Sequence, residues 1–394
     1  MRILLVNDYG TETGGAEIQL LLLRRCLRER GHDARLFSSG ARPGGAALKA
    51  DVTCFGTVTA LRTPLQVANP WAAWGLGRAI DAFRPDIVHV GVFLTQLSPS
   101  ILPVLRDVPA LLHAHWYRPV CPLGTKRLPD GRDCSYPWGT ACLENRCLRF
   151  RAWAPLMLQR QLWRARRATF DRYIACGEAV RERLVEAGFE GVRVIWNGVP
   201  VRPARAPLSG PPTAVFAGRM VPEKGVQVLV DAFARVVHER PDARLILAGD
   251  GPERTSIEER IAQHSLSGHV ECTGWLHGAA LDAILERAWL QVVPSLWVEP
   301  FGLTGAEAMM RGTAVVASAR GGPAELVRDG VTGILVEPGS PEALAGALLS
   351  LLGNRERAEA MGRDGRRFAL ERLTETIFVD RMIETYHEML GHEH

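Results

Sequence analysis

Two glutamates, Glu299 and Glu307, stand eight positions apart on either side of a Pro-Phe-Gly-Leu turn. The apolar run 290–294 predicts a short buried strand before the turn, and residues 304–311 predict a helix after it. Carboxylates accept hydrogen bonds, which suits the hydroxyl donors of a sugar. A plain strand-loop-helix connection with solvated glutamates explains the pattern equally well when it is taken alone.

Groups suited to binding phosphate occur in this turn and in an earlier turn that contains Arg219 and Lys224. Phe301, Gly302 and Leu303 lead into the predicted helix, where free backbone N–H groups bind anions. Arg219 and Lys224 follow another predicted strand, and together they can neutralise a diphosphate. Arginine supplies 44 of the 47 basic residues, so a lysine at this place favours a function over a solvated loop.

Two features of the N-terminal half also follow predicted strands. Gly14 and Gly15 precede a predicted helix over 16–30 and allow the backbone to approach a phosphate, although a tight turn capped by Thr13 is the alternative. His113 ends the strand predicted over 110–113 and is the candidate to bond a sugar hydroxyl or polarise the reacting centre, with a purely structural histidine as the alternative. The sequence does not match G-x-G-x-x-G, so a nicotinamide site is not supported.

Length and composition indicate a two-domain α/β protein. A chain of 394 residues exceeds what one hydrophobic core usually supports. Apolar runs alternate with helical patterns, which is typical of parallel sheets covered on both faces. We therefore predict two doubly wound Rossmann-like domains that face each other across an interdomain cleft. The Pro-rich stretch 204–212 is interpreted as a linker. The strands are predicted over 3–6, 34–37, 87–90, 110–113, 172–175, 192–195, 214–217, 244–248, 270–272, 290–293, 314–317 and 333–336.

The net charge and the first apolar run give expectations about the binding partners and the cellular location of the protein. A net charge of +4 with dispersed basic residues does not indicate a nucleic-acid partner. The first apolar run passes directly into Asn7 and Asp8, which predicts a strand and not a signal peptide, so a cytoplasmic location is expected. The segment 150–170 predicts a helix with apolar and arginine-rich faces. It is a candidate for peripheral membrane contact, with an ordinary domain helix as the alternative.

Four cysteines fall within a short segment. In a reducing compartment they are candidates for a structural zinc site, but their spacing lacks the C-x2-C signature, so buried thiols or a local disulfide stay open. The four are Cys121, Cys134, Cys142 and Cys147.

Taken together, these motifs resemble glycosyltransferase family 4 over nearly the whole chain. The E-x7-E pair formed by Glu299 and Glu307 is the most diagnostic. The other matching residues are Gly14-Gly15-Ala16-Glu17, His113, Gly218-Arg219, Glu223-Lys224-Gly225, Gly249-Asp250-Gly251, Pro300-Phe301-Gly302, Gly321-Gly322 and Glu325.

The resemblance implies a GT-B fold and a retaining transfer from a UDP- or GDP-sugar, with no metal or other cofactor required for catalysis. It implies that residues 1–200, completed by a C-terminal helix over 375–394, bind the acceptor and that residues 201–374 bind the nucleotide sugar. The acceptor is a small molecule, natural product, saccharide or lipid-linked hydroxyl.

The resemblance also implies a role for each site residue. Glu299 contacts the donor sugar, Glu307 contacts the ribose, and Arg219 and Lys224 contact the diphosphate. Gly15 contacts the phosphates through its N–H group, and His113 approaches the anomeric centre. Thr304-Gly305 departs from the bulkier apolar residues often found in the family, which leaves the choice of donor open.

Other functions on the same architecture are considered as alternatives. A nucleotide-sugar epimerase shares the fold. A phosphorylase is disfavoured because no lysine follows Lys224. A non-catalytic sugar-nucleotide-binding subunit would be expected to lack the charged residues Arg219, Lys224, Glu299 and Glu307.

Overall fold

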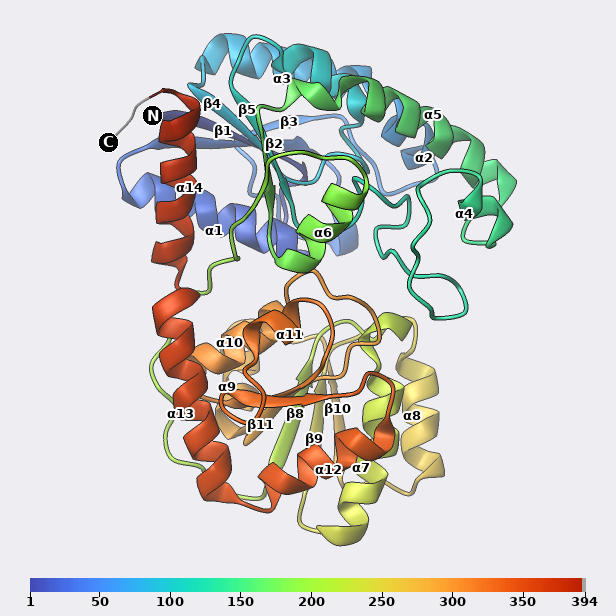
Figure 1. Ribbon diagram of the computed structural model, residues 1–394, viewed down its shortest axis with the longest axis vertical. Helices are drawn as coiled ribbons and strands as arrows, with labels where there is room; N and C mark the ends of the chain where they lie inside the picture. The colour runs from blue at the N-terminus through green and yellow to red at the C-terminus, as the bar shows by residue number, and fades with distance from the viewer. Residues whose placement is uncertain (392–394) are drawn as a thin grey trace. The chain divides into compact units, whose positions relative to one another are not determined.

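The computed structural model describes residues 1–391, which form two compact units. The first unit is Met1–Gly198 together with the segment that begins at Glu375, and the second is Val199–Thr374. Each unit contains one parallel sheet, and helices connect its successive strands (Figure 1). This is the doubly wound α/β architecture that the alternating pattern predicted.

The sheet of the first unit has seven strands in the order β3-β2-β1-β4-β5-β6-β7. The chain moves outward from β1 to β3 and then returns to β4, so the strand order reverses between β1 and β4. The central strands β4 and β5 are buried along their whole length, and β1 is buried except at its two ends, as expected for a sheet covered on both faces. The strands are β1 (Arg2–Tyr9), β2 (Asp33–Ser39), β3 (Val52–Cys54), β4 (Ile87–Val90), β5 (Ala110–Ala114), β6 (Arg172–Ala175) and β7 (Val192–Val194).

Helices connect these strands, and one long connection between β5 and β6 holds α4 and α5. The α-helices are α1 (Gly15–Glu29), α2 (Arg62–Val67), α3 (Pro70–Phe83), α4 (Ala141–Glu144), α5 (Phe150–Arg166), α6 (Glu178–Glu186) and α14 (Glu375–Met389). The 3-10 helices are η1 (Pro43–Gly45), η2 (Pro99–Leu105) and η3 (Arg167–Thr169).

The sheet of the second unit has six strands in the order β10-β9-β8-β11-β12-β13, and here the order reverses between β8 and β11. The strands are β8 (Thr213–Ala217), β9 (Arg244–Ala248), β10 (Val270–Gly274), β11 (Leu290–Val293), β12 (Ala314–Ser318) and β13 (Gly333–Val336). The helices are η4 (Pro222–Lys224), α7 (Val226–Glu239), α8 (Arg254–Gln263), α9 (Ala279–Arg287), α10 (Leu303–Arg311), α11 (Gly322–Leu326), α12 (Pro341–Leu352) and α13 (Arg355–Arg372).

The last helix of the described chain, α14, packs on α1 of the first unit (Figure 1). Its apolar stripe of Phe378, Met382 and Tyr386 is buried in the same core as β1 and α1. Ion pairs at 2.5 Å join Arg25 to Glu375 and Arg30 to Asp380 at its border. The helix therefore completes the core of the unit that begins the chain.

Two sequence interpretations differ from the structure. The composition of the Pro-rich stretch 204–212 predicts a linker, but Leu208 is buried in the core of the second unit, and its N–H group donates to Glu359 at 2.9 Å. The strand β3 was not predicted, because it is a three-residue edge strand with only Cys54 buried and has no period to detect.

Candidate active site

Lys224 and Glu299 meet where the strand order of the second sheet reverses. Lys224 lies in the connection after β8, and Glu299 lies in the connection after β11, so the neighbouring strands bring together residues that are 75 positions apart. The Lys224 Nζ lies 2.5 Å from Glu299 Oε1. In doubly wound sheets, ligands bind outside the carboxyl ends of the strands at this point.

The Lys224–Glu299 pair is largely buried, with 18% and 8% of the side chains exposed. Ser295 donates a hydrogen bond to the second carboxylate oxygen of Glu299. Both carboxylate oxygens of Glu299 therefore have a partner. The Lys224 ammonium has three donors, and within residues 1–391 Glu299 is its one hydrogen-bond partner. The remaining donors suit an anionic ligand.

Gly225 allows the two connections to touch. Its φ is +66°, a left-handed conformation that favours glycine. A Cβ at this position would lie 2.1 Å from the Pro294 carbonyl oxygen, which is backbone and cannot move aside cheaply. The N–H group of Leu296 also donates to Glu223 O at 2.8 Å. The backbone itself therefore sets the distance between Lys224 and Glu299.

A second close approach fixes the backbone of Glu299. Gly321 pairs with Glu299 in a parallel bridge, and Gly322 N–H donates to Glu299 O at 2.7 Å. A Cβ on Gly321 would lie 2.4 Å from that carbonyl oxygen. The Gly321-Gly322 pair thus holds the loop that carries the carboxylate.

Arg219 is exposed at the start of the connection after β8. Its side chain makes no ion pair or hydrogen bond within the described chain. The turn beneath it is held to the connection after β9, where Met220 N–H donates to Asp250 O at 2.8 Å. A Cβ on Gly249 would lie 1.8 Å from Gly218 O, which explains the glycine there. The guanidinium is left available beside the Lys224 loop.

The helix α10 begins directly after the Glu299 loop. Gly302 precedes it in a left-handed conformation with φ of 89° and ψ of 50°. Gly305 and Ala306 are the first residues whose N–H groups donate back, both to Gly302 O. The N–H groups of Leu303 and Thr304 come before them and lie at the positive end of the helix dipole, where anions bind favourably.

Glu307 lies within α10 and is partly buried. Burial raises the pKa of its carboxyl, while Arg311 and Arg202 oppose that rise. Arg311 is itself paired with Asp282. A partly buried carboxylate on the first helix after the switch point is suited to accept hydrogen bonds from a polar ligand.

In the first unit, Gly14 and Gly15 stand at the start of α1. Gly14 is the N-cap residue in an extended conformation, and its carbonyl accepts from Ile18 N–H at 3.0 Å. No side chain caps the helix, so the alternative of a Thr13 cap is wrong; the Thr13 hydroxyl lies 3.1 Å from that of Thr11. The role of Gly14 and Gly15 toward phosphate stays a prediction.

His113 lies in a group of three buried histidines under α14. Its ring centroid is 3.9 Å from that of His115, 5.3 Å from that of His89 and 6.1 Å from that of Phe378. Both of its ring nitrogens are buried and lack a hydrogen-bond partner within residues 1–391. His89 Nδ1 lies 2.7 Å from the Tyr386 hydroxyl. The role of His113 at an anomeric centre stays a prediction.

The three histidines are neutral at ordinary pH. Burial, with a smaller contribution from His115, lowers the pKa of His89 to about 3. Burial lowers the pKa of His115 to about 4, although the Asn197 side chain favours the charged ring. Burial also lowers the pKa of His113 well below its ordinary value. Each ring can therefore accept one hydrogen bond and donate another, and none carries a fixed charge.

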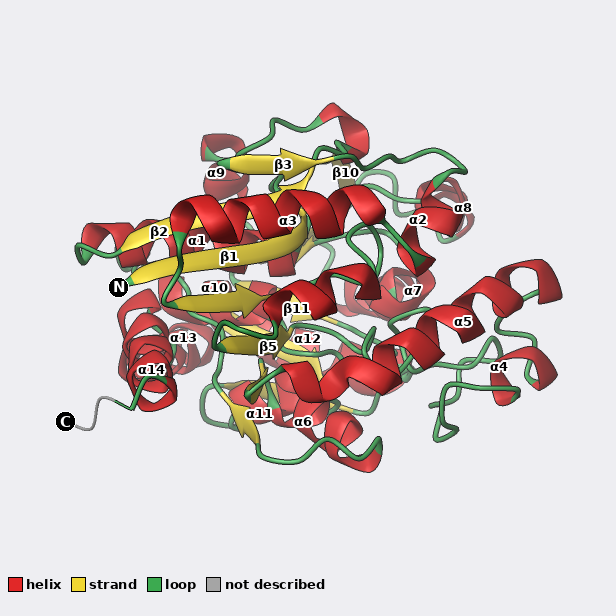
Figure 2. Ribbon diagram, turned by 90° about the horizontal axis from the view of Figure 1, so that it is seen from above, coloured by secondary structure: helices red, strands yellow, loops and turns green. Residues whose placement is uncertain are grey.

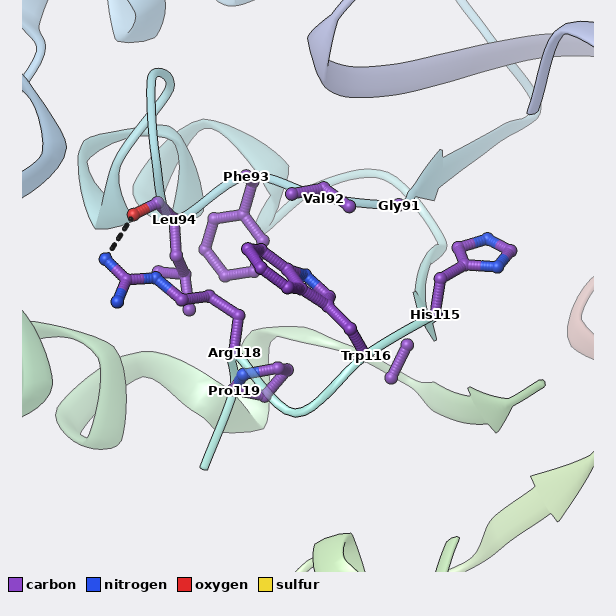
Figure 3. Close-up of a pocket in the computed structure, with 9 residues that line it drawn as sticks. Gly91, Val92, Phe93, Leu94, His115, Trp116, Arg118 and Pro119 are labelled. Carbon is purple, nitrogen blue, oxygen red and sulfur yellow. Dashed lines mark hydrogen bonds between the residues drawn. The ribbon is translucent and has the colours of Figure 1, made fainter. Parts of the chain in front are cut away.

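His115 lies one residue beyond β5 and lines a small cavity with Trp116 and Arg118 (Figure 3). The cavity has about 10 Å³ of space, enough for one water molecule. Arg118 is buried, donates to Leu94 O at 3.1 Å, and has its pKa lowered to about 10 by burial. Its neighbour Asp8 accepts hydrogen bonds from the loop after β4, so that carboxylate is already satisfied.

Structural zinc at the four candidate cysteines is not shown in the described residues and stays a prediction. All four are free thiols, and no group of three or more His, Cys, Asp or Glu in residues 1–391 is arranged to hold a metal ion. Burial raises the pKa of Cys142, and it raises that of Cys147 to about 11, so both are protonated at neutral pH.

Three residues around these sites were not identified from the sequence. Ser295 was visible only as a hydroxyl four positions before Glu299, and nothing in its spacing indicates that it bonds the carboxylate. Asp8 follows the first strand directly, and a polar residue at a strand end is a weak signal for a buried acceptor. Arg118 could not be distinguished from the many other arginines, because its burial depends on α2 and α5 closing over it.

Two family models match successive parts of the chain. Residues 13–202 match the family described as Glycosyltransferase Family 4, and residues 202–368 match the family described as Glycosyl transferases group 1. A glycogen synthase of Mycobacterium tuberculosis is 28% identical over 396 residues, which cover 93% of this chain and 89% of the relative. An α-maltose-1-phosphate synthase of the same species is 29% identical over 425 residues, which cover 99% and 100%.

Solved structures show the same architecture. Sucrose-phosphate synthase from Thermosynechococcus elongatus has a TM-score of 0.76 and 21% identity, and the match covers 100% of both chains. HepE of Anabaena, solved in complex with UDP and glucose, has a TM-score of 0.71 and 20% identity over 98% of this chain and 99% of its own. These likenesses establish the fold as GT-B, with two parallel-sheet α/β domains.

Proposed function

Because this chain belongs to glycosyltransferase family 4, we propose that its second unit binds a nucleotide-sugar donor at the switch point between β8 and β11. The observation that carries the proposal is the convergence of Lys224 and Glu299 at 2.5 Å in that place. A buried opposite-charge pair beside a helix N-terminus offers a donor for phosphate and an acceptor for a hydroxyl within one small volume.

Each neighbouring group has a proposed part in holding the donor. Arg219 and Lys224 neutralise the diphosphate, and the N–H groups that lead into α10 bind its oxygens. Glu299 accepts hydrogen bonds from the donor sugar, and Glu307 accepts them from the ribose. When the diphosphate arrives, the Lys224 ammonium gains a second anionic partner without releasing Glu299, because it has donors to spare.

The proposed reaction is a transfer with retention at the anomeric carbon. The anomeric C–O bond breaks, and its electron pair moves onto the departing diphosphate, where Arg219, Lys224 and the α10 amides stabilise the charge. The acceptor hydroxyl attacks from the same face, and its proton passes to the departing phosphate oxygen. No carboxylate nucleophile is required in this scheme.

The donor and the acceptor are proposed by class. A UDP-sugar is favoured because HepE was solved with UDP, and a GDP-sugar is the second candidate. The acceptor is a hydroxyl of a small molecule, natural product, saccharide or lipid-linked sugar. The comparisons give no support to the epimerase or non-catalytic alternatives. A cytoplasmic location and the roles of Gly14, Gly15 and His113 stay predictions.

The test is a thermal-shift panel of UDP-, GDP- and ADP-sugars, followed by detection of the released nucleotide. A donor that binds the folded state at about 100 times its Kd stabilises it by about 2.7 kcal/mol. We expect a shift with the true donor and its loss when Arg219 and Lys224 are both replaced by methionine. A donor that shifts the double variant as strongly as the wild type would place the binding site elsewhere.

A further inference from the structure

The helix α10 carries Glu307 and Arg311 one turn apart, and these two side chains do not pair with each other. A glutamate that is followed by an arginine four positions later commonly forms an ion pair on one face of a helix. Here the Arg311 guanidinium pairs instead with the carboxylate of Asp282 on α9. Within residues 1–391 the Glu307 carboxylate has no ion pair or hydrogen bond. Its oxygens therefore remain available to a ligand.

The backbone that carries Arg311 is fixed from two sides. The helices α10 and α13 lie side by side (Figure 2), and a Cβ on Gly362 of α13 would lie 2.1 Å from the Gly312 carbonyl oxygen. The N–H group of Arg205 also donates to Arg311 O at 3.0 Å. Because this end of α10 cannot shift easily, the backbone sets the position of Arg311 relative to Glu307.

Asp282 is placed to hold the guanidinium of Arg311. It lies in the first turn of α9, where the helix dipole favours a carboxylate, and its N–H group donates to Gly278 O at 3.0 Å. The side chains of Arg311 and Asp282 are 14% and 38% exposed, so salt screens this pair less than a fully exposed pair. The contact draws the guanidinium away from Glu307 but keeps its positive charge one helical turn away.

The charges around Glu307 decide how easily its carboxyl ionises. Burial raises the pKa of this carboxyl, Arg311 and then Arg202 lower it, and Asp282 raises it. Arg202 is exposed, so solvent screens its charge more than that of Arg311. Arg311 is therefore the main cation that favours the ionised form.

The other elements packed on α10 add few charged groups. The strands β11 and β12 contain no titratable side chain. The helix α11 contains Glu325, and α13 presents Arg366, whose guanidinium donates to Met310 O. Arg366 is thus occupied at the backbone of α10.

We propose that Arg311 is a positioning residue for the donor: it keeps Glu307 ionised, while Asp282 holds it away from the carboxylate oxygens. A direct pair between Glu307 and Arg311 would also stabilise the negative charge, but it would occupy the oxygens that accept from the ribose hydroxyls. The Asp282 contact separates these two effects, because the charge of Arg311 acts through space while its N–H groups bond elsewhere. This inference rests on the proposed function of Glu307 as the ribose ligand.

The test is isothermal titration calorimetry of the full-length protein with UDP, and in parallel with GDP, from about pH 5.5 to about pH 8.5. R311M should bind the nucleotide about threefold more weakly than the wild type at the acid end and equally well at the alkaline end, where Glu307 ionises without help. R311K keeps the charge and should restore the wild-type profile. R287M, in the exposed last turn of α9, is the matched control and should follow the wild type throughout.

Two further measurements separate positioning from a structural role. D282N frees the guanidinium to pair with Glu307, so binding should weaken about threefold at both ends of the pH range. D282N/R311M should behave as R311M does, because no guanidinium is left to compete. The 2′,3′-dideoxy form of the nucleotide lacks both ribose hydroxyls, so R311M should bind it as the wild type does. A structural role of Arg311 would weaken the binding of both forms equally.

The proposal is overturned if R311M binds like the wild type at the acid end, or if its defect is the same at both ends of the pH range. It is also overturned if D282N recovers at the alkaline end, or if R311M weakens the dideoxy nucleotide as strongly. Melting temperatures show which variants are folded, and D282N with R311K decides the question if R311M is not.

The same titrations distinguish this inference from the donor site itself. If the Arg219 and Lys224 double methionine variant loses the nucleotide while R311M binds normally, the donor site stands and only the role of Arg311 is refuted. If the wild type binds neither UDP nor GDP, the donor site is refuted as well.

Discussion

The ammonium of Lys224 and the carboxylate of Glu299 form an ion pair at 2.5 Å, although the two residues are 75 positions apart. The pair connects the two loops that flank the switch point of the second sheet. The sequence predicts each residue as a ligand for a different part of the donor. The structure adds that each is also the electrostatic partner of the other, so replacing one changes the environment of both.

The replacement Glu299→Gln should lower kcat/KM by about 100-fold to 1,000-fold. The amide keeps the shape but provides only one acceptor, and it leaves Lys224 without its counter-charge. The measurement is nucleotide release under steady-state conditions. Glu286→Gln, on the exposed end of α9, is the matched control and should retain full activity. Near-wild-type turnover in Glu299→Gln would refute the assignment.

The replacement Gly225→Ala should destabilise the second unit by about 2 kcal/mol or more, because a Cβ would meet the Pro294 carbonyl oxygen at 2.1 Å. Gly346→Ala, within α12 and with open space around the new Cβ, should instead stabilise by about 0.5–1 kcal/mol. Urea unfolding midpoints measure both. Equal midpoints for the two variants would show that the close approach is not required.

Replacing Glu307 by glutamine should raise the donor KM by about tenfold without lowering the melting temperature. Burial raises the pKa of this carboxyl, so its ionised form is costly in the folded state and a neutral amide removes that cost. The expected signature is a change in KM larger than the change in kcat. A variant with a normal KM but a reduced kcat would instead assign Glu307 to the chemical step.

The buried histidines should make the first unit sensitive to acid. Their folded pKa values lie below the unfolded value near 6.5, at about 3 for His89 and about 4 for His115. Between these values the unfolded chain binds more protons, so their stabilisation is present above pH 6.5 and is lost as the pH falls toward 4. For each ring, the free energy of unfolding should fall by about 2 kcal/mol as the pH is lowered from 6.5 to 5.

Urea unfolding as a function of pH checks this expectation. His89→Asn/His115→Asn should flatten the decline between pH 6.5 and 5, because neither replacement side chain titrates. His238→Asn, at the end of α7 in the second unit, should leave the decline unchanged. A decline of the same slope in all three proteins would assign the acid sensitivity to other groups.

The sequence alone determined the elements and the candidate ligands. Alternating apolar runs located every strand of the two sheets except β3, and the glycines marked turns that the structure shows to be close backbone contacts, such as Gly225 against Pro294. The family resemblance rested on the same short motifs. These features are local, because strand periodicity and turn chemistry depend on residues that are near one another in the chain.

Only the tertiary structure decided which distant groups meet. The strand order places β8 beside β11, and that order pairs Lys224 with Glu299 and leaves Ser295 for the second carboxylate oxygen. Packing under α14 encloses His113, while packing on η2 leaves Trp71 and Trp74 exposed. Hydrophobic periodicity in the sequence indicates that a residue lies on an apolar face of its element. The topology of the fold decides whether another element covers that face.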